Sequence, residues 1–391
     1  MKIVEIAEFY SLRGGGVKTY THQKLTACAE LGHSTTIIAP GKTNEEIRYP
    51  GGKIIFVKSP VLLVDPRYHF FRKKNDINVL IENENPDVLV GASPWNGGWI
   101  AGNWTSSKNT RKPLKILFMH TDPVAVYAYT LLDKFLSLKK IDNIFNFFWK
   151  YLVRLSNMYD ATIVGSPWLA KRFSHYKLNN VTSVPFGVEL SHFNPSCRNT
   201  LLRKAMLQKC NLTDNAILAL SAGRHHPEKR LKMIFQAIKK VQKSKKIGLY
   251  VVGDGPIRKW VEKWSHNNPN IYIAGQEDNR DHLANIMASS DILVHGSASE
   301  TFGRVIAESL ASGLPLVIPN QGAASSFYDH SYSEIYKAGD ADDAARAIIS
   351  LCKRDFKSSS KEAVKYATEN IGSDNEHFVR LYNFFKKQIN S

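Results

Sequence analysis

The chain has 391 residues, 43% of them hydrophobic, which is enough to bury two cores and too long for one ordinary domain. Its apolar runs fall short of the ~20 residues of a membrane-spanning helix, and it opens on a strand-like stretch rather than a charged leader, so we expect neither a spanning protein nor a secreted precursor. The four cysteines lack the paired spacing of a zinc or redox site, and we expect them to be reduced, as in the cytoplasm.

The chain is strongly basic, with a formal net charge of +17. Clustered Lys and Arg would indicate nucleic-acid binding. However, residues 1–190 carry 24 basic and 15 acidic groups and the remainder carries 28 and 20, so the excess is shared evenly. This distribution argues against a nucleic-acid groove and favours weak attraction to acidic membranes or phosphorylated substrates.

The first half of the chain predicts alternating strands and helices. A strand over 2–7 leads into a glycine loop at Gly14 to Gly16, a helix over 17–31 and a second strand over 35–39, which is the pattern of a parallel crossover. Further strands are expected over 53–57, 87–91, 114–119, 161–165 and 182–185.

A second series follows the polar stretch 186–195, whose composition suits a linker. Its expected strands cover 216–221, 248–252, 271–274, 292–295 and 316–318, with a helix over 232–241 between the first two. We predict an α/β protein with two parallel-sheet domains in tandem. Ligands bind at the carboxyl ends of parallel strands, so we expect the site in a cleft between two facing domains.

The strongest motif runs from Glu300-Thr301-Phe302-Gly303 to Glu308. If a helix begins near Gly303, its free N–H groups and positive dipole end can hold phosphate or sugar oxygens. Glu308 would then lie one to two turns inside the helix. A helix-capping carboxylate and an ordinary solvated glutamate would produce the same spacing, so that alternative stays open.

A second motif, residues 223–229, follows the strand that ends near Ser221. Arg224 and Lys229 are five residues apart and can bring two cations onto one diphosphate; a solvated basic loop is the alternative. The loop at Gly253 is by itself only a tight turn.

Together these segments resemble the family 4 glycosyltransferases, which are retaining, nucleotide-sugar-dependent enzymes of GT-B architecture. The resemblance covers nearly the whole chain through the glycine loop, PFGVELSHFNP, SAGRHHPEKRL, VVGDGP, IYIAGQ and SETFGRVIAESLASGLPLV. It implies an acceptor-binding Rossmann-like domain over 1–187, a donor-binding one over 188–371, and a last helix, 372–391, that crosses back to the first domain.

The resemblance also implies roles for individual residues. Arg224 and Lys229 would bind the donor diphosphate and stabilise the leaving group, Glu300 the sugar hydroxyls and Glu308 the ribose. The implied donor-binding residues are Gly15, Gly16, Arg224, Lys229, Gly253, Gly275, Gln276, Glu300, Thr301, Phe302, Gly303 and Glu308.

His120 closes a strand in the first domain, where the family places a histidine near the donor sugar. Without the resemblance, a satisfied histidine at a strand end would be the better interpretation. The resemblance implies a catalytic set of His120, Arg224, Lys229 and Glu300. The segment from His120 to Asp122 resembles mannosyl- and sulfoquinovosyl-type members, and we expect Trp95, Asn96 and Asp122 to contact the acceptor.

The resemblance implies front-face substitution, which needs no enzymic nucleophile. The one close match to a metal-binding Asp-X-Asp, residues 340–342, stands where a helix begins, so we expect Asp340 to cap that helix. We predict no cofactor and no obligatory metal.

Residues 134–177 interleave aromatic side chains with Lys and Arg, which suits a helix lying on an anionic membrane. A core-facing amphipathic helix would show the same pattern. We expect a cytoplasmic enzyme, peripheral on the inner face of the cytoplasmic membrane, that adds a hexose to a saccharide or lipid-linked saccharide of a surface polysaccharide or glycolipid.

GDP-mannose is the expected donor, and UDP-linked glucose, galactose or N-acetylglucosamine is the alternative. A nucleotide-sugar epimerase of the same fold should show acid–base carboxylates in the first domain, and a phosphorylase a pyridoxal-binding lysine. A nucleic-acid-binding protein should show a concentrated basic stripe.

Overall fold

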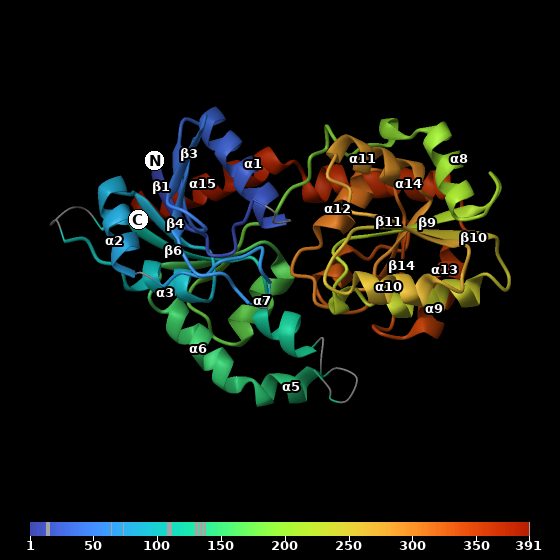
Figure 1. Ribbon diagram of the computed structural model, residues 1–391, viewed down its shortest axis with the longest axis horizontal. Helices are drawn as coiled ribbons and strands as arrows, with labels where there is room; N and C mark the ends of the chain where they lie inside the picture. Colours follow the sequence, from blue (N-terminus) through green and yellow to red (C-terminus); the bar gives the residue numbers. More distant parts are fainter. Residues whose placement is uncertain are drawn as a thin grey trace. The chain divides into compact units, whose positions relative to one another are not determined.

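The structure of the protein is a computed structural model that describes residues 1–12, 16–63, 65–72, 74–107, 112–129, 132, 136 and 138–390, with only the backbone of Tyr127. Contacts divide the chain into two compact units (Figure 1). Unit 1 comprises Met1–Val124, Leu136–Pro185 and Asp374–Ser391, and unit 2 comprises Ala125–Phe135 and Phe186–Ser373.

Unit 1 is built on an eight-stranded sheet in the order β3-β4-β2-β1-β5-β6-β7-β8. Its strands are β1 (Lys2–Ile6), β2 (Ser34–Gly41), β3 (Glu45–Tyr49), β4 (Gly52–Lys58), β5 (Val88–Gly91), β6 (Leu114–Met119), β7 (Ala161–Val164) and β8 (Val181–Ser183). All neighbours pair in parallel except β3, which forms an antiparallel edge with β4. The central strands are apolar runs buried along nearly their whole length, as parallel strands covered on both faces must be.

The helices of unit 1 are α1 (Gly16–Glu30), α2 (Lys74–Glu84), α3 (Asn96–Asn103), α5 (Leu138–Ile144), α6 (Asn146–Ser156), α7 (Pro167–His175) and α15 (Asp374–Asn390). A π-helical turn, η1 (Val124–Tyr129), follows β6. The last helix, α15, packs on α1, with the rings of Phe378 and Tyr20 5.4 Å apart. The predicted return of the last helix to the first domain is therefore confirmed.

Unit 2 is built on a six-stranded sheet in the order β11-β10-β9-β12-β13-β14, with all neighbours parallel. Its strands are β9 (Ile217–Ala222), β10 (Ile247–Val252), β11 (Ile271–Gly275), β12 (Ile292–Val294), β13 (Leu316–Pro319) and β14 (Ser333–Tyr336). Its helices are α8 (Thr200–Lys209), α9 (Leu231–Val241), α10 (Arg258–Ser265), α11 (Arg280–Ser289), α12 (Arg304–Ala311), α13 (Ala341–Leu351) and α14 (Phe356–Tyr366), with short turns η2 (Pro195–Cys197), η3 (Pro227–Lys229), η4 (Ala323–Phe327) and η5 (Ala367–Ile371).

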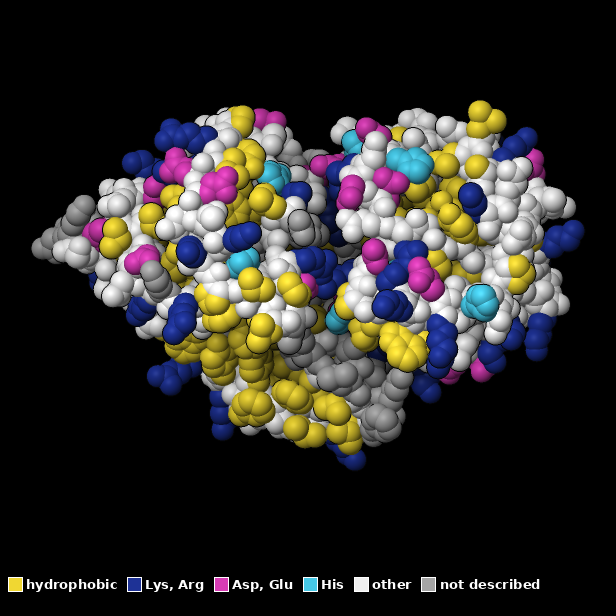
Figure 2. Space-filling view, in the orientation of Figure 1, with side chains coloured by type: hydrophobic (Ala, Val, Ile, Leu, Met, Phe, Trp, Pro, Cys, Tyr) yellow, Lys and Arg dark blue, Asp and Glu magenta, His cyan; other side chains and the backbone are white. Residues whose placement is uncertain are grey.

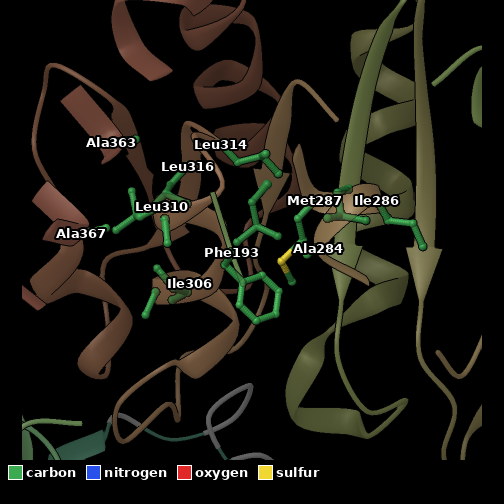
Figure 3. Packing of buried hydrophobic residues seen from close by; sticks show 14 of the residues in the cluster. Phe193, Ala284, Ile286, Met287, Ile306, Leu310, Leu314, Leu316, Ala363 and Ala367 are labelled. Atoms are coloured by element: carbon green, nitrogen blue, oxygen red, sulfur yellow. The ribbon is translucent and has the colours of Figure 1, made fainter. Parts of the chain in front are cut away.

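Helices cover both faces of the unit 2 sheet (Figure 1), and an apolar core lies between the sheet and each layer of helices. Side chains alternate between them along a strand, so Leu218 and Leu220 of β9 point into one core and Ala219 into the other. The first core holds α8, α11, α12 and α14, and Figure 3 shows Phe193 among α11 and α12 side chains such as Met287, Ile306 and Leu310. The second core holds α9, α10 and α13.

The prediction of two α/β parallel-sheet domains is confirmed, and each predicted strand is present within one or two residues of its expected bounds. Two strands were missed. The β3 strand is rich in charge and only partly buried, because it is an antiparallel edge and not a covered strand. The β14 strand has four residues, too few to show a period.

Across the described ranges, no helix is both long enough and apolar enough to traverse a bilayer.

Candidate active site

Three neighbouring strands of unit 2 end in glycines in the left-handed region. Gly223, Gly253 and Gly275 have φ values of 135°, 134° and 90° at the ends of β9, β10 and β11. The N–H of Gly223 donates to the carbonyl of Val252 (3.0 Å), and that of Gly253 to the carbonyl of Gly275 (2.7 Å). A Cβ on Gly253 would lie 1.9 Å from the Gly223 oxygen. Glycine is therefore required for these strand ends to meet in one backbone layer.

The loop after β9 positions the two predicted phosphate-binding cations. The buried His225 donates its backbone N–H to the carbonyl of Asp254 (2.9 Å), which ties this loop to the one after β10. The η3 turn then brings Lys229 inward, where its ammonium pairs with the Glu300 carboxylate, whereas Arg224 is exposed. One cation is thus held in place and the other lies at the surface of the same loop.

Glu300 lies in the buried loop between β12 and α12. Its Oε1 lies 3.2 Å from Nε2 of His295, whose side chain is 3% exposed, and pairs with Lys229. Burial alone would raise the pKa of Glu300, but Lys229 and His295 outweigh it and hold the pKa well below its usual range. Burial would lower the pKa of Lys229, but Glu300 raises it. The pair is therefore ionised, and the carboxylate can accept hydrogen bonds from hydroxyl groups.

The helix that follows this loop begins at Arg304, with Gly303 as its N-cap at φ 89° and no capping side chain. Phe302 turns its ring into the core, 5.3 Å from Phe186 and 5.9 Å from Phe327. Only the backbone of Phe302 can therefore serve a ligand. Thr301 is partly buried beside it.

Glu308 is 5% exposed, one turn into α12. Its Oε1 accepts from Nε of Arg304 (3.2 Å) and lies 3.4 Å from Nη2 of Arg280, which also pairs with Glu189 (2.5 Å). The alternative of a capping carboxylate with a solvated glutamate is therefore wrong, since Glu300 caps nothing and Glu308 is buried among arginines. His295, Arg280 and Glu189 were not singled out from the sequence.

The remaining predicted donor contacts differ in placement. Gln276 is exposed beyond β11, and its amide donates to Asp278 (2.5 Å). Gly16 starts α1, and a Cβ there would meet no described atom within 4 Å. Gly15 lies outside the described residues. Their donor-binding roles stay predictions.

In unit 1, His120 follows β6 in an aromatic setting. Its ring lies 4.6 Å from that of Phe118 and 5.2 Å from that of Tyr20, which it meets edge-on. Burial, together with the charges of Lys24 and His377, lowers the pKa of His120 to about 3. The imidazole is therefore neutral near pH 7 and can both donate and accept a hydrogen bond.

The predicted acceptor residues fall into two environments. Trp95 and Asn96 stand at the start of α3, where Trp95 packs 5.7 Å from Phe148 and the Asn96 amide donates to the carbonyl of Phe71 (2.9 Å). Asp122 is fully buried and pairs with Arg172. That burial favours a structural role for Asp122, and contact with an acceptor stays a prediction for all three.

Glu8, which was missed from the sequence, orders the start of α3. Its Oε2 accepts from the backbone N–H of Gly97 (2.9 Å) and from the hydroxyl of Ser93 (3.0 Å). Burial raises the pKa of Glu8, although these hydrogen bonds lower it. No local signal marks this contact, because Glu8 and Gly97 are far apart in the chain.

Asp340 accepts from the N–H groups of Asp342 (3.0 Å) and Asp343 (3.1 Å), so its predicted role as a helix cap is confirmed. Within the described part of the chain, no three His, Cys, Asp or Glu side chains gather as a metal site would require. Independence from metal stays a prediction.

Two tandem parallel-sheet units, with charged loops at the strand ends of the second, are the architecture of the GT-B fold. Two family models match this chain, Glycosyltransferase Family 4 over residues 14–192 and Glycosyl transferases group 1 over residues 203–370. The chain belongs to the family 4 glycosyltransferases and is therefore a glycosyltransferase.

Among curated relatives, the chain is 24% identical over 333 residues to the GDP-mannose-dependent alpha-(1-6)-phosphatidylinositol dimannoside mannosyltransferase of Mycobacterium tuberculosis, covering 83% of this chain and 80% of the relative. Among solved structures, sucrose-phosphate synthase from Thermosynechococcus elongatus superposes with a TM-score of 0.77 at 16% identity, over 99% of both chains. HepE from Anabaena in complex with UDP-glucose gives 0.71 at 15% identity, over 99% of this chain and 100% of its own. The two structures establish the fold.

Replacing His120 with asparagine should make the protein less sensitive to acid. Because the folded-state pKa lies below the ordinary value of 6.5, the unfolded chain binds the extra proton first, so stability is lost as the pH falls from 6.5 toward about 3. Between pH 6.5 and 5 the wild type should lose up to about 2 kcal/mol more than His120→Asn, measured by urea unfolding. The exposed His266→Asn should match the wild type, and equal losses in all three would contradict the assignment.

Proposed function

We propose that this enzyme transfers mannose from GDP-mannose, with retention of configuration, to a saccharide or lipid-linked saccharide in surface polysaccharide or glycolipid synthesis. The observation that carries the proposal is the half-buried Lys229–Glu300 ion pair at the strand ends of unit 2. The choice of donor is supported by the relative named as GDP-mannose-dependent.

In this proposal, unit 2 binds the donor. Arg224 and Lys229 hold the diphosphate, and the ionised Glu300 accepts hydrogen bonds from the sugar hydroxyls. The N–H groups of residues 301–303 precede α12 and supply further donors. Glu308 takes the ribose, with one carboxylate oxygen oriented by Arg304 and Arg280.

The reaction proposed is front-face substitution. The acceptor hydroxyl oxygen forms the new bond to C1 of mannose on the face from which the β-phosphate oxygen departs. The C1–O bond to phosphate breaks, the acceptor proton passes to the departing diphosphate, and GDP is released. Arg224 and Lys229 stabilise the developing charge without an obligatory metal. Glu300 is engaged by Lys229 and His295, and it takes no part as a nucleophile.

A UDP-sugar donor is the second candidate, because HepE, which has this fold, was solved with UDP-glucose. The base would meet the exposed loop from Gln276 to Asp278. Few contacts in that loop would decide between guanine and uracil, so the two donors share the diphosphate chemistry described above.

A thermal-shift screen against GDP, UDP, ADP and their sugar conjugates, without added metal, tests the donor. We expect GDP and GDP-mannose at ~100 times their dissociation constants to stabilise the wild type by ~2.7 kcal/mol. Arg224→Ala and Glu308→Gln should lose most of that stabilisation, whereas Lys353→Ala, an exposed lysine after α13, should keep it.

If UDP alone stabilises the wild type, a UDP-sugar replaces GDP-mannose as the proposed donor and the proposed binding site is unchanged. If the nucleotide stabilises all three variants as much as the wild type, the assignment of Arg224 and Glu308 to donor binding fails. If no nucleotide shifts the wild type, the proposal of nucleotide-sugar transfer fails.

The proposed lipid-linked acceptor is supported by the surface of α5 and α6. Ile144 is 55% exposed and Phe147 is 67% exposed, and the exposed Lys140 and Lys150 flank them. Figure 2 shows hydrophobic side chains gathered over this part of the molecule. We propose that this surface rests on an anionic membrane. Other apolar side chains of the predicted segment, Trp149 and Leu152, belong to the interior of unit 1.

Replacing Ile144 and Phe147 together with serine should weaken binding to phosphatidylglycerol-containing vesicles by at least about tenfold, because each exposed side chain contributes one to a few kcal/mol when buried. Co-sedimentation measures this. The control, Leu201→Ser with Val379→Ser, removes two exposed apolar side chains elsewhere and should bind like the wild type. If both double variants bind the vesicles equally well, the proposal that the surface of α5 and α6 rests on a membrane loses its support.

A further inference from the structure

A pocket of about 850 Å³ in unit 2 is lined by none of the residues assigned to the donor. It is formed by the loop after β9, the helices α9 and α10, and the loop from β14 to α13. Its volume falls in the range of pockets that hold small molecules. No role in sugar transfer has been assigned to it above.

This pocket and Glu308 belong to opposite faces of the unit 2 sheet. The helices α9, α10 and α13 cover one face of the sheet, and α11 and α12 cover the other (Figure 1). The core on the first face receives Ala219 and Val317, whereas the core on the second receives Leu218 and Leu316. A ligand in the pocket therefore contacts the helices of one face, and the ribose-binding glutamate stands on a helix of the other.

The lining of the pocket is basic. Arg230, Lys232 and Lys337 all contribute to it. The one acidic residue that lines it, Asp340, accepts two backbone N–H groups at the start of α13, which partly offset its charge. The net positive charge favours an anion.

One wall is apolar and aromatic. Met233 and Ile257 line it with Trp264, and the ammonium of Lys232 lies 5.9 Å from the Trp264 ring centroid. A flat ring can stack on the indole while an attached anion meets the cations. The wall and the charges together are typical of a site for a phosphate ester that carries a ring.

Arg230 occupies a conformation that side chains disfavour. It has φ 48° and ψ 38° between η3 and α9, where glycine would be less strained by about 1 kcal/mol. This turn sends successive side chains to different places, Lys229 to Glu300 and Arg230 to the pocket. The Arg230 side chain thus reaches the pocket from a strained backbone position.

We propose that this pocket is a second binding site, for a phosphate-bearing small molecule, with the phosphoryl group held by Arg230, Lys232 and Lys337 and its ring against Trp264. The phosphate ester can come from a soluble metabolite or from a lipid headgroup. The proposal does not depend on which nucleotide sugar is the donor.

The test is calorimetric titration of the full chain with mannose 1-phosphate and with pyrophosphate, alongside phosphatidylcholine vesicles with and without phosphatidic acid. Reversing two cations with Lys232→Glu and Lys337→Glu should weaken binding at least about tenfold. Lys239→Glu with Lys243→Glu makes the same change of charge on exposed residues outside the pocket and should leave binding within about twofold. Arg224→Ala should lose any binding of pyrophosphate at the loop assigned to the donor, but it should keep the binding that Lys232→Glu with Lys337→Glu weakens.

Tryptophan fluorescence of Trp264→Phe provides a second measurement, whose expected result differs from that of an unfolded variant. Ligand binding should change the tryptophan fluorescence of the wild type, and this change should be absent in Trp264→Phe while its calorimetric binding remains. Binding of the soluble probes identifies a metabolite, and binding only of phosphatidic acid vesicles identifies a lipid headgroup. The proposal is overturned if mannose 1-phosphate, pyrophosphate and the phosphatidic acid vesicles all fail to bind. It is also overturned if both charge-reversal pairs weaken binding equally, or if Arg224→Ala abolishes all binding.

Discussion

The ion pair between Lys229 and Glu300 is the contact on which the proposed donor site of unit 2 depends. Neither charge would be stable alone in this buried loop, because desolvation disfavours both. Their mutual attraction, with His295 beside them, keeps the carboxylate ionised and the ammonium charged. The pair joins the loop after β9 to the loop before α12 and presents opposite charges side by side, as a substrate with both a diphosphate and hydroxyl groups requires.

The backbone layer beneath this pair explains why the pair can form. The backbone at Gly253 approaches Gly223 more closely than a side chain on Gly253 would allow, and Gly223 has a positive φ that favours glycine. A parallel sheet places every strand end at one edge, so loops far apart in sequence meet there. Loops at neighbouring strand ends also meet in unit 1, where Glu8, which follows β1, accepts a hydrogen bond from the start of α3, which follows β5. In both units, the scaffold is apolar and the chemistry lies in the loops.

Most of the fold follows from sequence pattern, because buried parallel strands are continuous apolar runs between glycine and proline turns. The charged edge strand β3 and the four-residue strand β14 were not predicted, because neither contains such an apolar run. The spacing of Arg224, Lys229, Glu300 and Glu308 predicted a site, but it did not predict which residues contact these side chains. Arg280 and Glu189 meet Glu308 only through folding, and no local signal marks them. The sequence also did not show which aromatic side chains of residues 134–177 are buried, so it left open whether Trp149, a core residue, faced the core or a membrane.

The most direct measurement is a double-mutant cycle on donor turnover, following release of GDP from GDP-mannose by the wild type, Lys229→Gln, Glu300→Gln and the double variant. If the two residues act as one unit, each single change should lower kcat/KM by at least about a hundredfold, and the double variant should be little worse than either. Glu262→Gln, an exposed glutamate on α10, should match the wild type. Near-normal turnover by Glu300→Gln, or losses that simply multiply in the double variant, would contradict the role assigned to the pair.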